Sequence, residues 1–166
     1  IDESRSSPAG PARIIRLIGP DGIITTFAGS ATSGSGFSGD GGPATEARFS
    51  LTLRVAVVSD GSVYIADVHN GRIRRVGTDG IIDTVADLRT RVNGIAAGGD
   101  GSVYVTVNDR FRVDRITPEG VISTIAGTGQ NCVASPFDCG DGGPATQADL
   151  NPWGIAVDRH DNVYLY

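Results

Sequence analysis

The sequence lacks lysine and methionine altogether, and it holds only two histidines and one tryptophan. All 14 basic residues are therefore arginines, and the formal net charge of −5 argues against a nucleic-acid partner, whose binding needs basic contacts to phosphates. Aromatic residues make up only 6% of the chain, which disfavours an RNA-binding surface of stacking side chains. Apolar runs stay well short of the roughly 18 residues that a membrane-spanning helix needs, so we expect no membrane insertion.

Because residue 1 is isoleucine rather than methionine, we expect the chain to be processed or to be part of a longer one. Cysteine is also scarce, since Cys132 and Cys139 are the only two and both lie in one glycine-rich stretch. Their separation permits a local disulfide, which is the usual state of such a pair in a secreted protein. Two free thiols are the alternative, and zinc is disfavoured because no histidine or further cysteine lies near them.

Glycine is abundant, with 24 residues, and it punctuates a sequence that repeats itself. Residues 54–64, 94–104 and 154–164 read RVAVVSDGSVY, GIAAGGDGSVY and GIAVDRHDNVY. Each segment holds two short apolar stretches around an Asp-Gly or Asp-Asn pair. Such pairs tolerate the positive φ of primed turns, so each segment predicts a β-hairpin.

A second hairpin pattern lies at residues 13–28, 72–86 and 112–126, where arginine alternates with isoleucine or valine. Together the two hairpins predict a unit of four strands in a meander. Small residues such as Ala56 and Ala96 suit inner strands that converge on an axis, and the arginine-rich outer strands suit a half-solvated rim. This gradient predicts an all-β fold, a β-propeller built of four-stranded blades.

The repeats divide the chain into about three blades' worth of strands, with split blades at both ends. Both long connections between units contain the string GDGGPAT. The expected organisation is an N-terminal extended segment 1–12, half units 13–29 and 151–166, complete units 54–87 and 94–127, and long loops 30–50 and 128–150.

The stretch VYIADVHNGRIRRV, residues 63–76, resembles the NHL repeat, with Asp67, Asn70 and Arg72 at the family's recurrent polar positions. GDGGPAT followed by an apolar GIAVD strand is similar to NHL units of bacterial secreted proteins and of teneurin-type extracellular proteins. The sequence departs from the pattern at Arg54, where a small residue is usual. The resemblance implies a propeller, usually of six blades. It also implies that Asp67 and Arg72 form a structural contact that ties the second strand of a unit to the third.

The strand count is two, four, four and two, or three blades, whereas usual propellers have about four to eight. Either the rest of a longer chain or a second copy must then complete the ring. The terminal strands are apolar and lack the lysine or proline that often blunts an edge. We therefore expect half unit 13–29 of one copy to pair with half unit 151–166 of another, in a six-bladed dimer or a filament. The residues expected at these edges are Ile14, Ile15, Leu17, Val163, Tyr164, Leu165 and Tyr166.

Candidates for a chemical site are few. His69 and His160 fall in turns and are interpreted as surface residues, because metal-dependent propeller enzymes need two or three such ligands. One carboxylate in each GDGG turn falls short of the roughly six to eight oxygens of a calcium site, so a tight glycine turn is favoured over calcium. Trp153, Arg54 and His69 are the candidate binding residues, and Trp153 alternatively packs its loop onto a blade. The loop carboxylates considered for calcium are Asp40, Asp138, Asp141 and Asp149.

These features predict a non-enzymatic module for protein interaction or structural assembly, located outside the cell or at its surface. No catalytic residue, metal or cofactor is expected. The expected partners are other copies of the chain, or a protein or glycan ligand. Two alternatives stay open on the family resemblance: a metal-dependent propeller enzyme of the lyase or lactonase type, and the ligand-sensing domain of a larger receptor.

Overall fold

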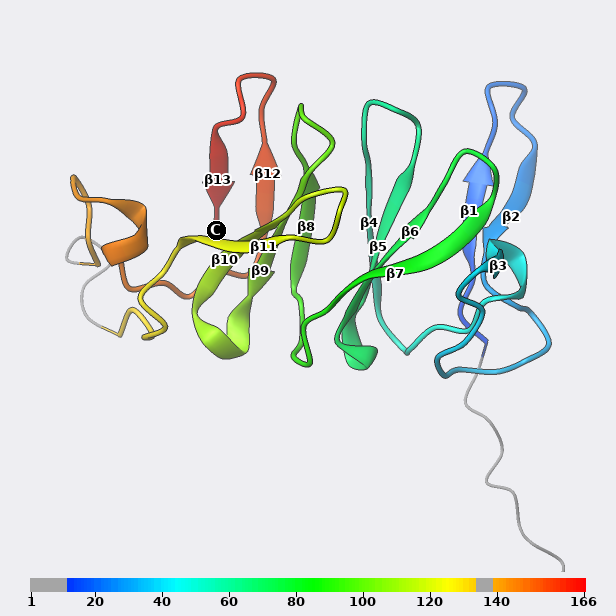
Figure 1. The fold of residues 1–166 in the computed structure, drawn as a ribbon, viewed down its shortest axis with the longest axis horizontal. Helices are drawn as coiled ribbons and strands as arrows, with labels where there is room; N and C mark the ends of the chain where they lie inside the picture. The colour runs from blue at the N-terminus through cyan, green and yellow to red at the C-terminus, as the bar shows by residue number, and fades with distance from the viewer. Residues whose placement is uncertain (1–11, 134–138) are drawn as a thin grey trace, which may run out of the picture.

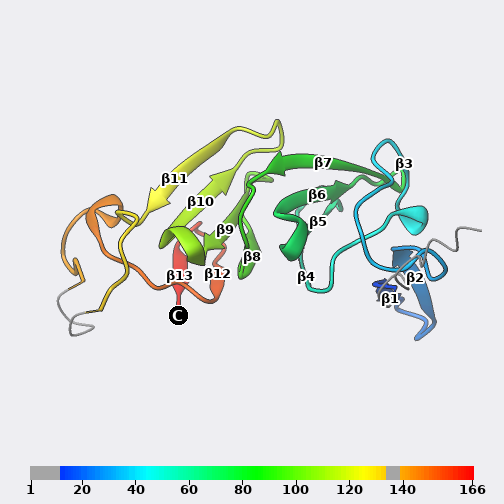
Figure 2. The ribbon, with the colours of Figure 1, turned by 90° about the horizontal axis from the view of Figure 1, so that it is seen from below.

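The computed structural model describes residues 12–133 and 139–166, and in those ranges it contains only β-strands, short 3-10 helices, turns and loops. The strands form four antiparallel sheets, which lie side by side along an open arc (Figures 1 and 2). No helix in these ranges has the length and apolar character needed to cross a membrane. Apart from residue 12, the expected N-terminal segment 1–12 lies outside the described residues.

Two of the sheets are complete blades and two are half-blades. The N-terminal half-blade consists of β1 (Ile15–Ile18) and β2 (Ile24–Ala28). The first complete blade consists of β4 (Leu53–Val57), β5 (Val63–Asp67), β6 (Arg72–Val76) and β7 (Ile81–Asp87). The second complete blade consists of β8 (Gly94–Ala97), β9 (Val103–Val107), β10 (Arg112–Ile116) and β11 (Ile122–Ala126). The C-terminal half-blade consists of β12 (Ile155–Val157) and β13 (Val163–Leu165).

The hairpin turns form as the Asp-Gly pairs predict. In the first complete blade, Gly61 has φ +88°, and the Asp60 carboxylate accepts the Ser62 N–H at 2.7 Å. Asp161 occupies the corresponding turn of the C-terminal half-blade at φ +61°, a conformation that aspartate tolerates better than most residues. Its carboxylate accepts the Gly99 N–H at 2.8 Å, so this turn also fastens the half-blade to its neighbour.

The first strands of successive blades lie next to one another, β4 beside β8 and β8 beside β12, on the concave side of the arc (Figure 2). Buried apolar side chains fill the space between sheets in two clusters. One cluster joins the two complete blades and includes Ile73 and Val105. The other joins the N-terminal half-blade to the first complete blade and includes Ala28, Phe49 and Ile82. This radial packing of four-stranded sheets confirms the predicted propeller architecture.

One strand is not predicted by the repeats. The first long loop, residues 30–50, contains β3 (Gly42–Pro43), which pairs with the outer edge of β7 and makes the first complete blade five-stranded. A single 3-10 turn, η1 (Ala44–Glu46), follows it. The loop therefore crosses from the end of the N-terminal half-blade to the outer strand of the next blade, and its Phe49 is fully buried there.

Candidate assembly surfaces

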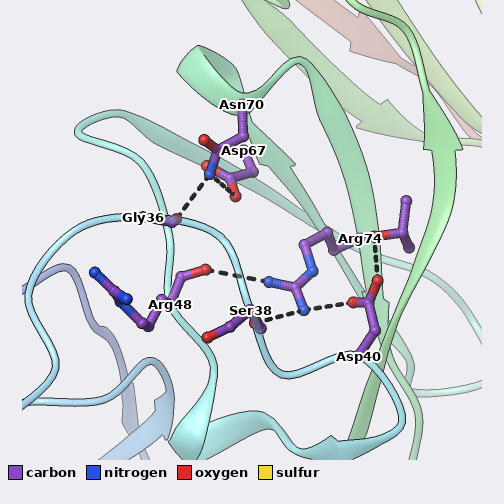
Figure 3. Close-up of polar contacts among 8 residues, drawn as sticks. Gly36, Ser38, Asp40, Arg48, Asp67, Asn70 and Arg74 are labelled. Carbon is purple, nitrogen blue, oxygen red and sulfur yellow. Dashed lines mark hydrogen bonds and ion pairs between the residues drawn. The ribbon is translucent and has the colours of Figure 1, made fainter.

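The first long loop holds an arginine from the blade that it covers (Figure 3). Arg74, in the middle of β6, is fully buried and donates to Ser38 O at 3.1 Å, to Arg48 O at 3.2 Å and to the Asp40 carboxylate at 2.5 Å. The second oxygen of Asp40 accepts the Thr84 hydroxyl at 2.7 Å. We call Ser38 O, Arg48 O and the Asp40 carboxylate the arginine cradle. Because every acceptor comes from the loop, the cradle fastens the loop to the blade.

Aromatic rings complete the environment of this guanidinium. The Cζ atom of Arg74 lies 5.0 Å from the centre of the Phe37 ring and 5.3 Å from that of Phe49. Both distances fall within the range of cation–π contacts, which gain strength where water is excluded. The buried charge of Arg74 is thus paired and hydrogen-bonded through both Nη atoms and covered by the two rings, whereas its Nε has no hydrogen-bond partner among the described residues.

The predicted contact between Asp67 and Arg72 does not form. The two residues lie opposite each other in the β5–β6 register, but their side chains bind different partners. Asp67 is fully buried and accepts the Ser50 N–H at 2.8 Å and the Asn70 amide at 2.7 Å, and Asn70 also donates to Gly36 O (Figure 3). Arg72 pairs at 3.1 Å with Asp87, which belongs to β7. Asp67 and Asn70 therefore fasten the first long loop, and Arg72 joins the third strand of the blade to the fourth.

The second long loop, residues 128–150, repeats the backbone of the first over its described residues. Gly143 N–H donates to Gly140 O at 3.1 Å, as Gly42 N–H does to Gly39 O at 3.1 Å. A 3-10 turn, η4 (Ala145–Gln147), takes the place of η1. Asp149 N–H donates to Cys139 O at 2.9 Å, as Arg48 N–H does to Ser38 O at 3.3 Å. In this alignment Asp141 stands where Asp40 stands in the first loop.

The predicted disulfide is present in this second loop. Cys132 and Cys139 are bonded to each other, with their Cα atoms 5.7 Å apart. Cys139 occupies the position of Ser38, so the bond anchors one wall of the loop. The segment between Gly140 and Asn151 lines a hollow of about 560 Å³ together with the two cysteines. In the first loop, the corresponding concave side faces β7 and Arg74.

The half-blades leave side chains exposed that the complete blades bury. Tyr164, the second residue of β13, is 56% exposed, whereas Tyr64 and Tyr104 at the same repeat position are 1% and 8% exposed. Ile18, the last residue of β1, is 68% exposed, whereas the corresponding Val76 and Ile116 are 1% and 0% exposed. The open sides of β1 and β13 are therefore surfaces of blade-interior character without a cover in this structure.

The candidate binding residues do not converge on one site. Arg54 and Trp153 line one hollow of about 380 Å³ with Tyr166, near the first strands of the blades. His69 lies in η2 (Val68–Asn70) and lines a different hollow. His160 is exposed in the β12–β13 turn. Trp153 is itself exposed, so it does not pack its loop onto the blade through a buried ring.

Two of the loop carboxylates considered for calcium bind side chains of the chain itself. Asp40 binds Arg74 and Thr84, and Asp149 accepts the Thr128 hydroxyl. Asp138 lies outside the described residues. Across residues 12–133 and 139–166, no three His, Cys, Asp or Glu side chains gather in a group that could hold a metal ion.

Two hairpin aspartates are electrostatically linked to the third strands of their blades. The Ser62 N–H bond holds the pKa of Asp60 below its usual value, and Arg75, at 3.0 Å, adds to the shift. The Ser102 N–H bond lowers the pKa of Asp100 in the same way, with a further contribution from Arg115. A carboxylate whose pKa is lower in the folded state stabilises the fold above its unfolded pKa, and that contribution is lost as the pH falls through the folded pKa.

Acidification is accordingly expected to lower the free energy of unfolding progressively below about pH 4, where an unfolded-state aspartate begins to bind protons. Urea unfolding midpoints measured between neutral pH and about pH 2.5 check this, with the double variant D60N/D100N as the comparison. The double variant should show a shallower loss in acid than the wild type, and D83N, on the exposed side of β7, should match the wild type. Equal acid sensitivity in wild type and double variant would contradict the assignment.

Comparison with known sequences supports the repeat. The NHL repeat family model matches residues 53–76, which span β4 to β6. Teneurin-1 of Mus musculus is 57% identical over 44 residues, covering 24% of this chain and 2% of the relative. Teneurin-4 of Homo sapiens is 54% identical over 44 residues, with the same coverage of 24% and 2%. The chain thus matches only a small fraction of the length of these relatives.

Comparison with solved structures supports the architecture. A chain of a nidogen/laminin complex superposes with a TM-score of 0.60 at 16% identity, covering 94% of this chain and 50% of that chain. A streptogramin B lyase gives a TM-score of 0.56 at 14% identity, covering 92% and 40%. A putative gluconolactonase gives 0.54 at 13% identity, covering 93% and 42%. Identities this low show the shared fold alone: the chain has a β-propeller fold, and its residues 53–76 match the NHL repeat.

Proposed function

We propose that this chain is a non-enzymatic interaction module that assembles by completing split blades. The C-terminal half-blade of one copy joins the N-terminal half-blade of another, so that β13 pairs with β1. The observation that carries the proposal is the exposure of Tyr164 and Ile18 at positions that both complete blades bury. Burying such apolar surface is the main driving force of protein association.

The internal repeats supply the register of this pairing. In the first complete blade, Val63 lies opposite Val76 and Tyr64 lies opposite Arg75, and in the second, Val103 lies opposite Ile116 and Tyr104 opposite Arg115. The register carried over to the half-blades therefore pairs Val163 with Ile18, Tyr164 with Leu17 and Leu165 with Arg16. A shift by one residue would turn every apolar side chain to the wrong face of the sheet.

The turn chemistry of the half-blades fits this pairing. In the complete blades, Asp60 and Asp100, in the turns before the second strands, form ion pairs with Arg75 and Arg115 of the third strands. His160 takes the place of the aspartate in the C-terminal half-blade, and Leu17 takes the place of the arginine in the N-terminal one. The seam therefore holds neither an unpaired aspartate nor an unpaired arginine at this position.

Two copies would together supply the strands of six blades, and the superposed chain of the nidogen/laminin complex is covered to 50% by one copy. A heterologous contact of this type closes a ring where the rotation allows it and otherwise extends as a filament. The Cys132–Cys139 disulfide supports a location outside the cell, because such bonds persist in oxidising surroundings.

The proposal is tested by the mass of the native particle. Sedimentation and light scattering over a wide concentration range are expected to give a dimer or a larger assembly. The variant I18D should raise the dissociation constant at least about tenfold, because it places a charge in an apolar seam. V121D changes an apolar residue of similar exposure, 62% against 68%, just before β11, and as the matched control it should assemble normally. A wild-type mass of one chain at all concentrations would overturn the proposal.

A further inference from the structure

The type of residue at the centre of a blade's third strand differs with the length of the connection that precedes the blade. The first complete blade follows a long loop, and Arg74 fills the cradle of that loop. The second complete blade follows a short link, residues 88–93, and carries Asp114 at the same position. Asp114 is satisfied within its own blade by Arg112 at 2.9 Å and by the Thr124 hydroxyl at 2.8 Å. An arginine at this position is thus the partner of a GDGGPAT loop.

The N-terminal half-blade carries an arginine at this position. The β-bulge recurs between Ile15 and Arg16 as it does between Ile73 and Arg74, which aligns Arg16 with Arg74. Thr26 lies opposite Arg16 as Thr84 lies opposite Arg74. Arg16 is exposed and donates only to Thr25 O of its own hairpin among the described contacts, at 3.2 Å. The half-blade therefore presents an arginine guanidinium and a threonine hydroxyl, the two groups that Asp40 binds in the first complete blade.

The second long loop presents the matching cradle. Its backbone repeats the first loop, with Asp141 in the place of Asp40 and the Cys139 and Asp149 carbonyls in the places of Ser38 O and Arg48 O. None of the described residues donates a hydrogen bond to the Asp141 carboxylate. Within one chain Arg16 cannot fill this cradle, because the N-terminal half-blade and the second long loop lie at opposite ends of the arc (Figure 1).

The N-terminal half-blade also exposes an apolar side chain that the first complete blade buries. Ile82 of β7 is fully buried where β3 covers it, and Ile122 of β11, which has no such cover, is 41% exposed. The corresponding Ile24 of β2 is 52% exposed. A strand like β3 laid along β2 would therefore bury Ile24 as β3 buries Ile82. Gly143 and Pro144 are the residues of the second loop that correspond to β3.

We propose that residues 139–150 of the second long loop form an intermolecular clasp for the N-terminal half-blade of a second copy. Asp141 of one copy binds the Arg16 guanidinium and the Thr26 hydroxyl of the other, and Gly143–Pro144 pair with Ile24 and Ile23 as an added strand. The clasp rests on the proposed assembly through split blades. It adds a second, charged contact that this loop provides, and the molecule bound there is a second copy of this chain.

Charge reversal tests the clasp. In the variant R16E the cradle meets a second carboxylate, and in D141R two guanidinium groups meet, so each variant alone should assemble at least about tenfold more weakly than the wild type. In a mixture of the two variants, a pair made of one copy of each brings the two substituted side chains, which carry opposite charges, together at one seam. The other seam of that pair keeps the natural contact between Arg16 and Asp141. The mixture is therefore expected to recover the wild-type mass and affinity by sedimentation.

The recovery separates an interface effect from a folding defect, since two misfolded chains would not rescue each other. E46R, which makes the same charge change on the outside of the first loop, is the matched control and should assemble as the wild type does. The clasp is overturned if the wild type assembles and the single variants assemble as tightly as it does, or if the mixture of variants does not recover the wild-type affinity. Either result leaves the split-blade proposal standing. A wild type of one-chain mass, as expected if the remainder of a longer chain covers these edges, overturns both.

Discussion

Replacing Arg74 with alanine is expected to lower the free energy of unfolding by about 3 kcal/mol, the lower end of the range for breaking a buried ion pair, because Arg74 is fully buried but Asp40 is 36% exposed. The side chain is fully buried and makes three hydrogen bonds to the first long loop. Its loss removes the guanidinium donor from two carbonyl groups and from the Asp40 carboxylate, and it opens a cavity beside Phe49. A change of this size is a large fraction of the roughly 5–15 kcal/mol that stabilises a typical domain.

Chemical denaturation followed by circular dichroism measures this effect, and R75A is the matched control. Arg75 is the next residue of the same strand, but its pair with Asp60 is solvent-exposed on both sides. Exposed pairs of this kind contribute only about 0–1 kcal/mol, so R75A should stay close to the wild type. Similar losses in R74A and R75A would show that the cradle does not set the stability of the loop.

Replacing Phe49 with alanine is expected to cost about 3–5 kcal/mol, which is typical of removing a buried phenylalanine. Phe49 is fully buried and belongs to the cluster that joins the N-terminal half-blade to the first complete blade. Its ring also lies against the Arg74 guanidinium. The substitution therefore creates a cavity and weakens the cradle at the same time.

F37A provides the comparison for Phe49, because the Phe37 ring belongs to the same loop and also faces Arg74, but it lies closer to Arg72, with 4.1 Å from Cζ to the ring centre, and is 40% exposed. Loss of an exposed cation–π contact corresponds to about 0.5–1 kcal/mol. Hydrogen exchange of the β6 and β7 amides should accelerate in F49A and stay near the wild-type rate in F37A. Equal protection of these strands in both variants would contradict the anchoring role of Phe49.

The sequence was sufficient to predict the blades because their signals are local. Asp-Gly turns and alternating apolar residues determine each hairpin, and offsets of 40 and 60 residues between Tyr64, Tyr104 and Tyr164 reveal the repeat. The structure places strands at the predicted hairpins, and the radial arrangement of the sheets follows from their packing.

The arginine cradle was not predicted because the residues that form it lie far apart in the sequence, in the first long loop and in β6. A Gly-Pro strand contradicts β-propensity, so β3 forms only because the loop is fastened at Asp40, Phe49 and Asp67. The prediction for Asp67 and Arg72 failed because facing positions in a register do not determine where polar side chains find donors. A comparison of RIRRV and IIRLI with RVDRI, read beside the two GDGGPAT strings, contains the signal that would have found the cradle.

The position of the disulfide has a further consequence. Cys132–Cys139 lies in the second long loop, whereas the equivalent first loop has no cysteine and is held by the side chains of its own blade. A covalent link restricts the conformations of this loop. In the assembly that we propose, less conformational entropy would then be lost when the loop binds a second copy, which is the advantage of preorganisation. The bond thus constrains the end of the arc that we propose as the contact with a second copy.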